Sequence, residues 1–214
     1  SNTTNDPVTY ASWRDCIVWC NAYSEKSGLN PVYYTNSGFT TPLRASTGVG
    51  TVDTTPGSED NPYVNWSANG YRLPTEAEWE FAARYIDGTN WTPTSYLSGA
   101  TADYYDSAAS QEVAWYGNIE SKTHEVGIKR ANALGLYDMS GNMWEWCWDW
   151  YDSLTSDPEM DPRGSTTGDY RLIRGGSFGD NVLCCQTAYR GINWFDYPSS
   201  STYSNGFRIV RSSN

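Results

Sequence analysis

Apolar and polar positions follow the period of a helix in one early segment of the chain. Between residues 12 and 27, Trp13, Ile17 and Cys20 recur at a spacing of three to four, which places them on one helical face. Gly28 follows directly, and glycine is common just beyond the end of a helix. The pattern predicts a helix over residues 12–27 with its apolar face in the core.

A second helix is predicted by its start signal as well as by its spacing. Thr75 and Glu78 have the spacing of a capping box, in which the Thr75 hydroxyl accepts from the Glu78 amide and the Glu78 carboxylate accepts from the Thr75 amide. Trp79 and Ala83 then supply a buried face. We expect this helix to begin at Thr75 and to end near Tyr85.

The remaining pattern favours short strands and long loops. Residues 87–129 are polar and rich in turn formers, so we expect irregular structure there. No low-complexity linker divides the chain, so we expect one α+β domain over residues 1–214 with two helices and much irregular loop. The expected strands lie at residues 32–34, 143–150, 170–174, 185–190 and 207–211.

Composition shifts the expected core from aliphatic to aromatic side chains. The 214 residues include 11 Trp, 17 Tyr and 19 Gly. Aromatic rings must therefore supply much of the buried apolar area, and the glycines indicate many tight turns.

The net charge of −11 excludes two classes of partner. Such a surface repels phosphate backbones and anionic lipid, so we expect no nucleic-acid partner and no binding to a membrane surface. No run of about 18 apolar residues is present, so we expect no membrane-spanning segment. The polar opening at residues 1–5 shows no signal peptide and does not settle the compartment.

Five cysteines are too few, and odd in number, for a disulfide-rich scaffold. Cys16 and Cys20 lie in the predicted helix, where a buried apolar role suits them better than a bridge. Cys147 with Cys185 is the pair to test first for a disulfide, and we expect most of the thiols to be free.

Four motifs follow one another along the chain. They are Tyr-Arg-Leu-Pro-Thr-Glu-Ala-Glu-Trp-Glu at 71–80, Gly-Leu-Tyr-Asp-Met-Ser-Gly-Asn-Met-Trp-Glu-Trp at 135–146, Arg-Gly-Gly-Ser at 174–177 and Asn-Gly-Phe-Arg at 205–208. Together they resemble the formylglycine-generating-enzyme, or sulfatase-modifying-factor, family over about residues 8–211. The resemblance implies a C-type-lectin-like fold with short antiparallel strands.

The catalytic cysteines of that family are not reproduced here. Its enzymes oxidise a sulfatase cysteine with copper(I) held by two thiolates five positions apart after the Gly-Gly-Ser turn. Counted forward from Ser177 these positions are Asp180 and Cys185, and counted back from Arg190 they shift by one. Cys184 does not replace the missing thiol, because adjacent side chains of a strand diverge. We therefore expect no catalytic residue and no copper.

Two other metal sites follow from the resemblance. Relatives with non-haem iron hold it through several histidines, whereas this chain has only His124, so we expect no iron. The family also holds Ca²⁺ at positions that match the side chains of Asp138 and Glu145 and the carbonyls of Gly141 and Met143. Such oxygen ligands suit Ca²⁺. The alternative is that both carboxylates accept hydrogen bonds from loop amides.

The segment 178–205 resembles the variable region of proteins that retroelements diversify on this same fold. Randomised adenines in Asn codons never give Gln, Glu, Lys, Met or Trp, and in this segment only Gln186 and Trp194 lie outside the permitted set. The mixture of Tyr, Ser, Gly and Asp with large aromatics is typical of antibody loops. We interpret Cys185, Ala188 and Trp194 as inward-facing framework. The expected ligand-binding residues, clustered on one exposed face, are Phe178, Gly179, Asp180, Asn181, Leu183, Cys184, Tyr189, Gly191, Ile192, Phe195, Asp196, Tyr197, Ser199, Ser200, Ser201, Thr202, Tyr203 and Ser204.

The sequence therefore favours a non-enzymatic, receptor-type protein that binds a macromolecular ligand, either a protein or a glycan, through a hypervariable face. By resemblance it belongs on a bacterial cell surface or outside the cell, with lipid attachment through a removed N-terminus as one option. Two alternatives stay open. One is a formylglycine-generating type of cysteine oxidase centred on Cys185, and the other is a Ca²⁺-dependent lectin that binds carbohydrate near Asp138 and Glu145.

Overall fold

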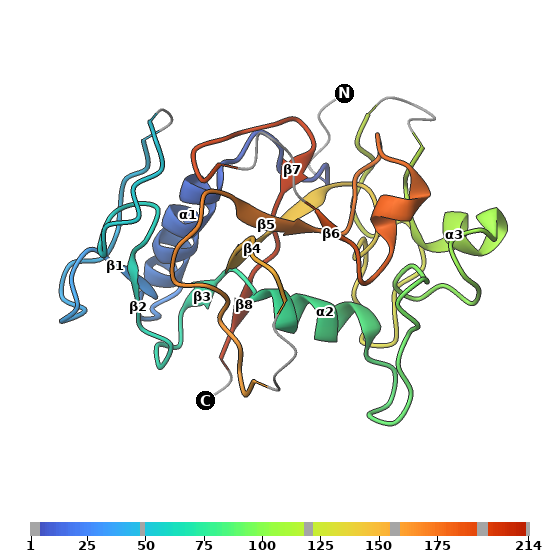
Figure 1. Ribbon diagram of the computed structural model, residues 1–214, viewed down its shortest axis with the longest axis horizontal. Coiled ribbons are helices and arrows are strands. Elements are labelled where there is room, and N and C mark those ends of the chain that lie inside the picture. The colour runs from blue at the N-terminus through green and yellow to red at the C-terminus, as the bar shows by residue number, and fades with distance from the viewer. Residues whose placement is uncertain (1–4, 48–49, 118–121, 155–158, 192–196, 213–214) are drawn as a thin grey trace.

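The computed structural model describes residues 5–47, 50–117, 122–154, 159–191 and 197–212. In this part of the chain, short helices and strands alternate with long stretches of loop (Figure 1). The helices are α1 (Trp13–Lys26), α2 (Glu76–Arg84), α3 (Ser107–Val113) and the 3-10 helix η1 (Val182–Cys185). The strands are β1 (Tyr33–Tyr34), β2 (Tyr63–Val64), β3 (Tyr71–Arg72), β4 (Trp144–Trp150), β5 (Arg171–Arg174), β6 (Arg190–Gly191), β7 (Asn205–Gly206) and β8 (Val210–Arg211).

Strands β4 and β5 lie at the centre, with α1, β1 and β2 toward one end of the molecule and α3 at the other (Figure 1). They belong to a four-stranded sheet of order β6-β5-β4-β7, and the pairs β1-β2 and β3-β8 form two smaller sheets. All pairings are antiparallel except that of β4 with β7. The expectation of purely antiparallel strands is therefore corrected to a mixed sheet.

Both predicted helices are confirmed, and so is the capping box predicted at the start of α2. Ser12 caps α1 and forms a capping box with Asp15, while Thr75 and Glu78 form the predicted box at the start of α2. These contacts satisfy amides that have no partner within the helix, which fixes where each helix begins.

Strand β4 is buried along its whole length because it packs on both faces. Trp144, Trp146 and Trp148 face the cluster that includes the apolar face of α1, whereas Cys147 faces the cluster that includes Trp79 of α2. This alternation is the period-two pattern of a strand, and it makes aromatic rings the main filling of the core.

An arginine lies inside this aromatic core. The Arg171 guanidinium is fully buried, 3.7 Å from the Trp13 ring centroid and 3.6 Å from that of Trp150. It also donates to the carbonyls of Trp148 and Asp60. Burial lowers the pKa of Arg171 well below its usual range. Stacking and carbonyl acceptors together offset part of the cost of desolvating the cation.

Three expectations about local structure need correction. Helix α3 lies in the segment expected to be irregular; it is short, and its Ala- and Ser-rich sequence has no apolar stripe, so capping by Asp106 and tertiary packing carry it. Of the strand expected at residues 185–190, only Arg190 is in a strand, β6, because Cys185 is the last residue of η1 and a bend and turn occupy residues 186–188. Of the strand expected at residues 207–211, only Val210–Arg211 is a strand, β8, while β7 lies just before the expected range.

All five cysteines are free thiols, so the pair Cys147 and Cys185 forms no disulfide. The two residues lie in separate core clusters, one with Trp79 and the other with Leu97. Cys16 and Cys20 are fully buried in the core, as predicted. Among the described residues, no helix has the length and apolar character needed to cross a membrane.

Candidate functional site

The candidate binding segment begins at a tight turn after β5. Gly175 and Gly176 have φ values of 96° and 75°, a region in which glycine is favoured. A β-carbon on Gly176 would lie 2.7 Å from the Cys185 sulfur, so the turn also requires glycine for space. The turn therefore sets η1 directly against the end of β5, with Cys185 beneath it.

Two of the predicted ligand-binding residues have structural partners within this segment. The Asp180 carboxylate accepts from the Ser177 amide at 3.0 Å and from the Ser177 hydroxyl at 2.5 Å. The Asn181 side chain accepts from the Leu183 amide at 3.0 Å. These side chains hold the loop and the start of η1, although Asp180 is half-buried and Asn181 exposed.

Most of the described positions in the predicted binding set are exposed or half-buried. Leu183, Tyr197 and Tyr203 are 42, 39 and 58% exposed. The exposed or half-buried members are Gly179, Asp180, Asn181, Leu183, Cys184, Tyr189, Tyr197, Ser199, Ser200, Ser201, Thr202, Tyr203 and Ser204. Ile192, Phe195 and Asp196, together with the framework candidate Trp194, lie outside the described residues.

Two positions in the set are buried and belong with the framework instead. Phe178 is 5% exposed and its ring lies 6.0 Å from that of Tyr203. Gly191 is a buried member of β6, and a β-carbon there would lie 2.6 Å from the Trp144 ring and 2.7 Å from Ile173. Packing of Gly191 against β4 and β5, and burial of Phe178 beside Tyr203, therefore override the expectation that these two positions face solvent.

Two tyrosines at the ends of the loop of residues 197–204, called the later loop below, make different contacts. Tyr203 lies over Phe178, which connects the loop to the turn after β5. Tyr197 packs on Tyr170 at 4.8 Å between ring centroids, and their hydroxyl oxygens are 3.2 Å apart. Between them, the Thr202 carbonyl accepts from the Tyr10 amide at 2.9 Å. The loop is therefore anchored at several points, while its Tyr and Ser side chains reach the surface.

The cysteines of this region are poorly placed for thiolate chemistry. Cys185 is fully buried, and burial raises the pKa of its thiol well above the usual range. Its neighbour Cys184 is half-buried, and burial raises the pKa of that thiol too. Because these residues lie in η1, the sequence argument that assumed a strand was wrong in detail. The described residues contain no exposed pair of thiols here.

The predicted Ca²⁺ ligands have other partners. Both Glu145 oxygens accept from Arg208, at 2.6 and 2.8 Å, and one also accepts from the Trp79 indole at 2.7 Å. One Asp138 oxygen accepts from the Gly127 amide at 2.7 Å, whereas its Oδ1 atom is buried without a hydrogen-bond partner. Desolvation raises the pKa of Asp138.

This arrangement fits Ca²⁺ poorly. The Gly141 carbonyl accepts from the Met143 amide at 2.8 Å, and an ion at Glu145 would have to displace Arg208. Asp138 Oδ1 is one uncommitted oxygen, whereas Ca²⁺ takes about six to eight oxygen ligands. Within the described residues, no group of three or more His, Cys, Asp or Glu side chains could hold a metal. The Ca²⁺ site stays a prediction, and the geometry favours the hydrogen-bond alternative.

Ion pairs join the four sequence motifs two by two. Arg174 of the third motif pairs with Glu80 of the first at 2.6 Å, and Arg208 of the fourth pairs with Glu145 of the second at 2.6 Å. Arg174 is fully buried, so its pairing with Glu80 takes place at the edge of the core. The sequence shows that the motifs carry opposite charges, but it does not show which arginine pairs with which glutamate. That choice depends on the fold.

The whole chain matches a known domain family. The sulfatase-modifying factor enzyme 1-like domain matches residues 1–213. The chain belongs to this family.

Solved structures give the most extensive similarity. The chain matches the Treponema denticola variable protein 1 with a TM-score of 0.80 and 33% identity, over 98% of this chain and 72% of that one. It matches the structure of CarF with a TM-score of 0.70 and 29% identity, over 98% of this chain and 69% of that one.

Sequence relatives carry names of more than one kind. The chaperone protein LppX of Paenibacillus barcinonensis is 32% identical over 96% of this chain and 70% of its own length. A formylglycine-generating enzyme of Thermomonospora curvata is 35% identical over 69% of this chain and 51% of its own. The chain thus spans about half the length of that enzyme. Some of its relatives are named as enzymes, and others carry names that do not denote an enzyme.

Proposed function

We propose that this chain is a non-enzymatic, receptor-type binding protein that displays variable residues on a lectin-like scaffold. The observation that carries the proposal is the similarity to the Treponema denticola variable protein 1 over 98% of the chain. The composition of the segment 178–205 points the same way, because Tyr, Ser and Gly suit a surface that must bind many ligands.

The display face consists of the exposed and half-buried residues of two loops. It includes Leu183 and Tyr189 from the region of η1 and Tyr197, Ser201 and Tyr203 from the later loop. Phe178 and Gly191 are excluded, because both pack in the framework. Exposed aromatic rings of this kind give large contact area at a small cost in conformational entropy.

The ligand that we propose is a macromolecule, a protein or a glycan, met at a bacterial surface or outside the cell. The negative charge of the chain argues against nucleic acid. The Ca²⁺-dependent lectin is a weaker candidate, because Arg208 occupies both oxygens of Glu145.

The test is to diversify the face and to select binders. A phage-displayed library randomised at Leu183, Tyr189, Tyr197, Ser201 and Tyr203 is selected against immobilised lysozyme, with bovine serum albumin as the counter-selection target. We expect folded, lysozyme-specific binders, because four of the five randomised side chains lie outside the core and the half-buried Tyr189 packs only at its edge. A matched library randomised at buried positions should yield few folded members; those positions are Trp144, Ile173, Phe178, Cys185 and Gly191. If the two libraries fold equally poorly, the proposed face is framework and the proposal fails.

The oxidase alternative is tested separately. A sulfatase-type cysteine peptide is incubated with the protein, copper(I) and oxygen, and formylglycine is sought by mass spectrometry. We expect no product, because Asp180 stands where a second thiolate is required and Cys185 is buried. Product that Cys185→Ser abolishes would establish the enzyme instead.

A further inference from the structure

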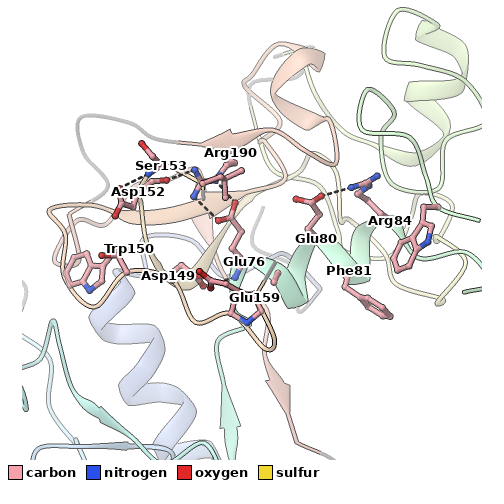
Figure 2. Close-up of a pocket in the computed structure, with 16 residues that line it drawn as sticks. Glu76, Glu80, Phe81, Arg84, Asp149, Trp150, Asp152, Ser153, Glu159 and Arg190 are labelled. Carbon is pink, nitrogen blue, oxygen red and sulfur yellow. Dashed lines mark hydrogen bonds and ion pairs between the residues drawn. The ribbon is translucent and has the colours of Figure 1, made fainter. Parts of the chain in front are cut away.

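A cavity of about 580 Å³ lies along helix α2, and none of the proposed display residues lines it. Figure 2 shows Asp149 and Glu76 toward one end and Phe81 and Arg84 toward the other, with Glu80 between them. The walls come from α2, the end of β4 and the described parts of the loop that follows it, residues 152–154 and 159–165. The cavity is therefore built from framework, separate from the display face.

Both glutamates of α2 that line the cavity are neutralised by arginine. The Glu76 carboxylate accepts two hydrogen bonds from Arg190, at 2.6 and 2.8 Å. The Glu80 carboxylate accepts from Arg84 at 2.7 Å and from Arg174 at 2.6 Å. Because the two arginines that line the cavity are committed to these glutamates, neither is available to balance another acid there.

Asp149 is different, because it is buried without a cation in contact. It is 5% exposed, and its Oδ2 atom accepts from the Glu76 amide at 2.7 Å. Among the described residues no lysine or arginine forms an ion pair with it. Burial raises the pKa of Asp149 to about 6, and the nearby charge of Glu76 adds to this effect while Arg171 opposes it. The acidic Asp152 and Glu159 lie along the same wall.

The other end of the cavity is aromatic. Phe81 and Trp91 are 51 and 41% exposed, and their ring centroids lie 5.4 Å apart in an edge-on arrangement. Two large rings that remain this exposed beside a cavity offer apolar area to a ligand.

The two ends lie within reach of a short peptide segment. Glu76, beside Asp149, and Phe81 are five positions apart in α2, which corresponds to a rise of about 7.5 Å along the helix axis and a turn of about 140°, so their side chains diverge and the ends lie farther apart than the rise alone. In an extended chain, side chains two residues apart point to the same face, and their backbone positions lie about 7 Å apart. A long basic side chain and an aromatic side chain of such a segment would reach both ends of the cavity, because the length of the basic side chain adds to the backbone spacing.

We propose that this cavity binds an extended peptide segment with a basic side chain at Asp149 and an aromatic side chain, two residues away, against Phe81 and Trp91. The peptide is recognised by charge at one end and by ring contact at the other. The site does not depend on the display face, so it stands or falls without the proposed function.

The probe is the peptide acetyl-Ala-Arg-Ser-Phe-Ala-amide carrying fluorescein, and its binding is followed by fluorescence anisotropy. Asp149→Asn keeps an acceptor for the Glu76 amide and removes the charge, so Kd should rise by about tenfold or more. Phe81→Ala keeps a good helix former and removes a ring, so Kd should rise by about three- to tenfold. The peptide with Glu in place of Arg should bind at least about tenfold more weakly.

The pH profile identifies the group responsible. With a pKa of about 6 for Asp149, the ionised fraction rises about tenfold between pH 5 and pH 7, so wild-type binding should tighten by about that factor. The other charged groups that face Asp149 are Glu76 from α2, Arg171 from β5 and Arg190 from β6. Asp149→Asn leaves these in place and should lose the profile.

Several outcomes would overturn the proposal. They are the absence of saturable binding to folded wild-type protein at millimolar peptide, equal binding of the Arg and Glu peptides, or affinities that neither variant changes. If Asp149→Asn fails to fold, Phe81→Ala and the two peptides decide the matter on their own.

Discussion

Gly191 lies within the segment expected to vary, yet replacing it by alanine should destabilise the protein. Its backbone pairs with Ile173 of β5, and a β-carbon would lie 2.7 Å from that side chain and 2.6 Å from the Trp144 ring. Both neighbours are buried, so neither can move into solvent. Overpacking of this kind costs about 1–3 kcal/mol in free energy of unfolding. For a chain of this size the melting temperature should fall by about 2–12 °C.

Gly179→Ala is the matched control. Gly179 is exposed, and the nearest atom to its β-carbon would be the Ser177 hydroxyl oxygen at 3.9 Å, an ordinary contact. This substitution should change the free energy of unfolding by no more than about 0.5 kcal/mol. Urea unfolding followed by tryptophan fluorescence measures both variants, because the core is rich in buried tryptophan. If Gly191→Ala is as stable as Gly179→Ala, then Gly191 is not confined by its neighbours and belongs with the display residues after all.

Three further predictions concern charge. Arg208→Ala should lower the free energy of unfolding by about 3 kcal/mol or more in urea melts, because it leaves the buried Glu145 without its cation. The control is Arg44→Ala, which breaks an exposed ion pair with Glu25 and should lower the free energy of unfolding by less than about 1 kcal/mol. A chelator should leave the melting temperature unchanged, because Arg208 occupies Glu145; a fall that added Ca²⁺ reverses would establish the ion. Burial raises the pKa of Asp149 from 3.8 to about 6, so the folded state holds this proton more tightly than the unfolded chain. The free energy of unfolding should therefore fall as pH rises from about 4 to 6, and an unchanged slope in Asp149→Asn would refute this.

Patterns between residues close together in sequence predicted the structure best. The capping boxes at Ser12 and Thr75 involve residues only three positions apart, so a reader of the sequence can find them without knowing the fold. Helix α3 could not be predicted in this way, because its seven residues include too few apolar side chains to show the period of a helix. The expected strand at residues 185–190 failed for a different reason. Its residues alternate as in a strand, but Cys185 packs under Gly176 at the end of η1, and a bend and turn follow at residues 186–188.

The candidate site was harder to predict than the fold. Composition singled out the segment 178–205 as rich in Tyr, Ser, Gly and Asp, but it could not tell which of these residues face inward. Burial of Phe178 and Gly191 depends on contacts with residues more than ten positions away in sequence, and the pairing of Arg208 with Glu145 is equally distant in sequence. The cavity at Asp149 could not be predicted from the sequence either. An acidic residue among tryptophans fits a buried strand as well as it fits the wall of a cavity.

The pairing of the four motifs gives a physical reason why this framework could carry a variable surface. Ion pairs that join the motifs, such as those of Arg174 and Arg208, use no residue of the proposed display face. A domain has only about 5–15 kcal/mol of net stability, and one broken buried pair removes a large share of it. A substitution at an exposed position such as Ser201 removes almost none of this stability. Sequence can therefore change on one surface at little risk to folding, while the charged and glycine positions beneath it cannot change independently of their partners.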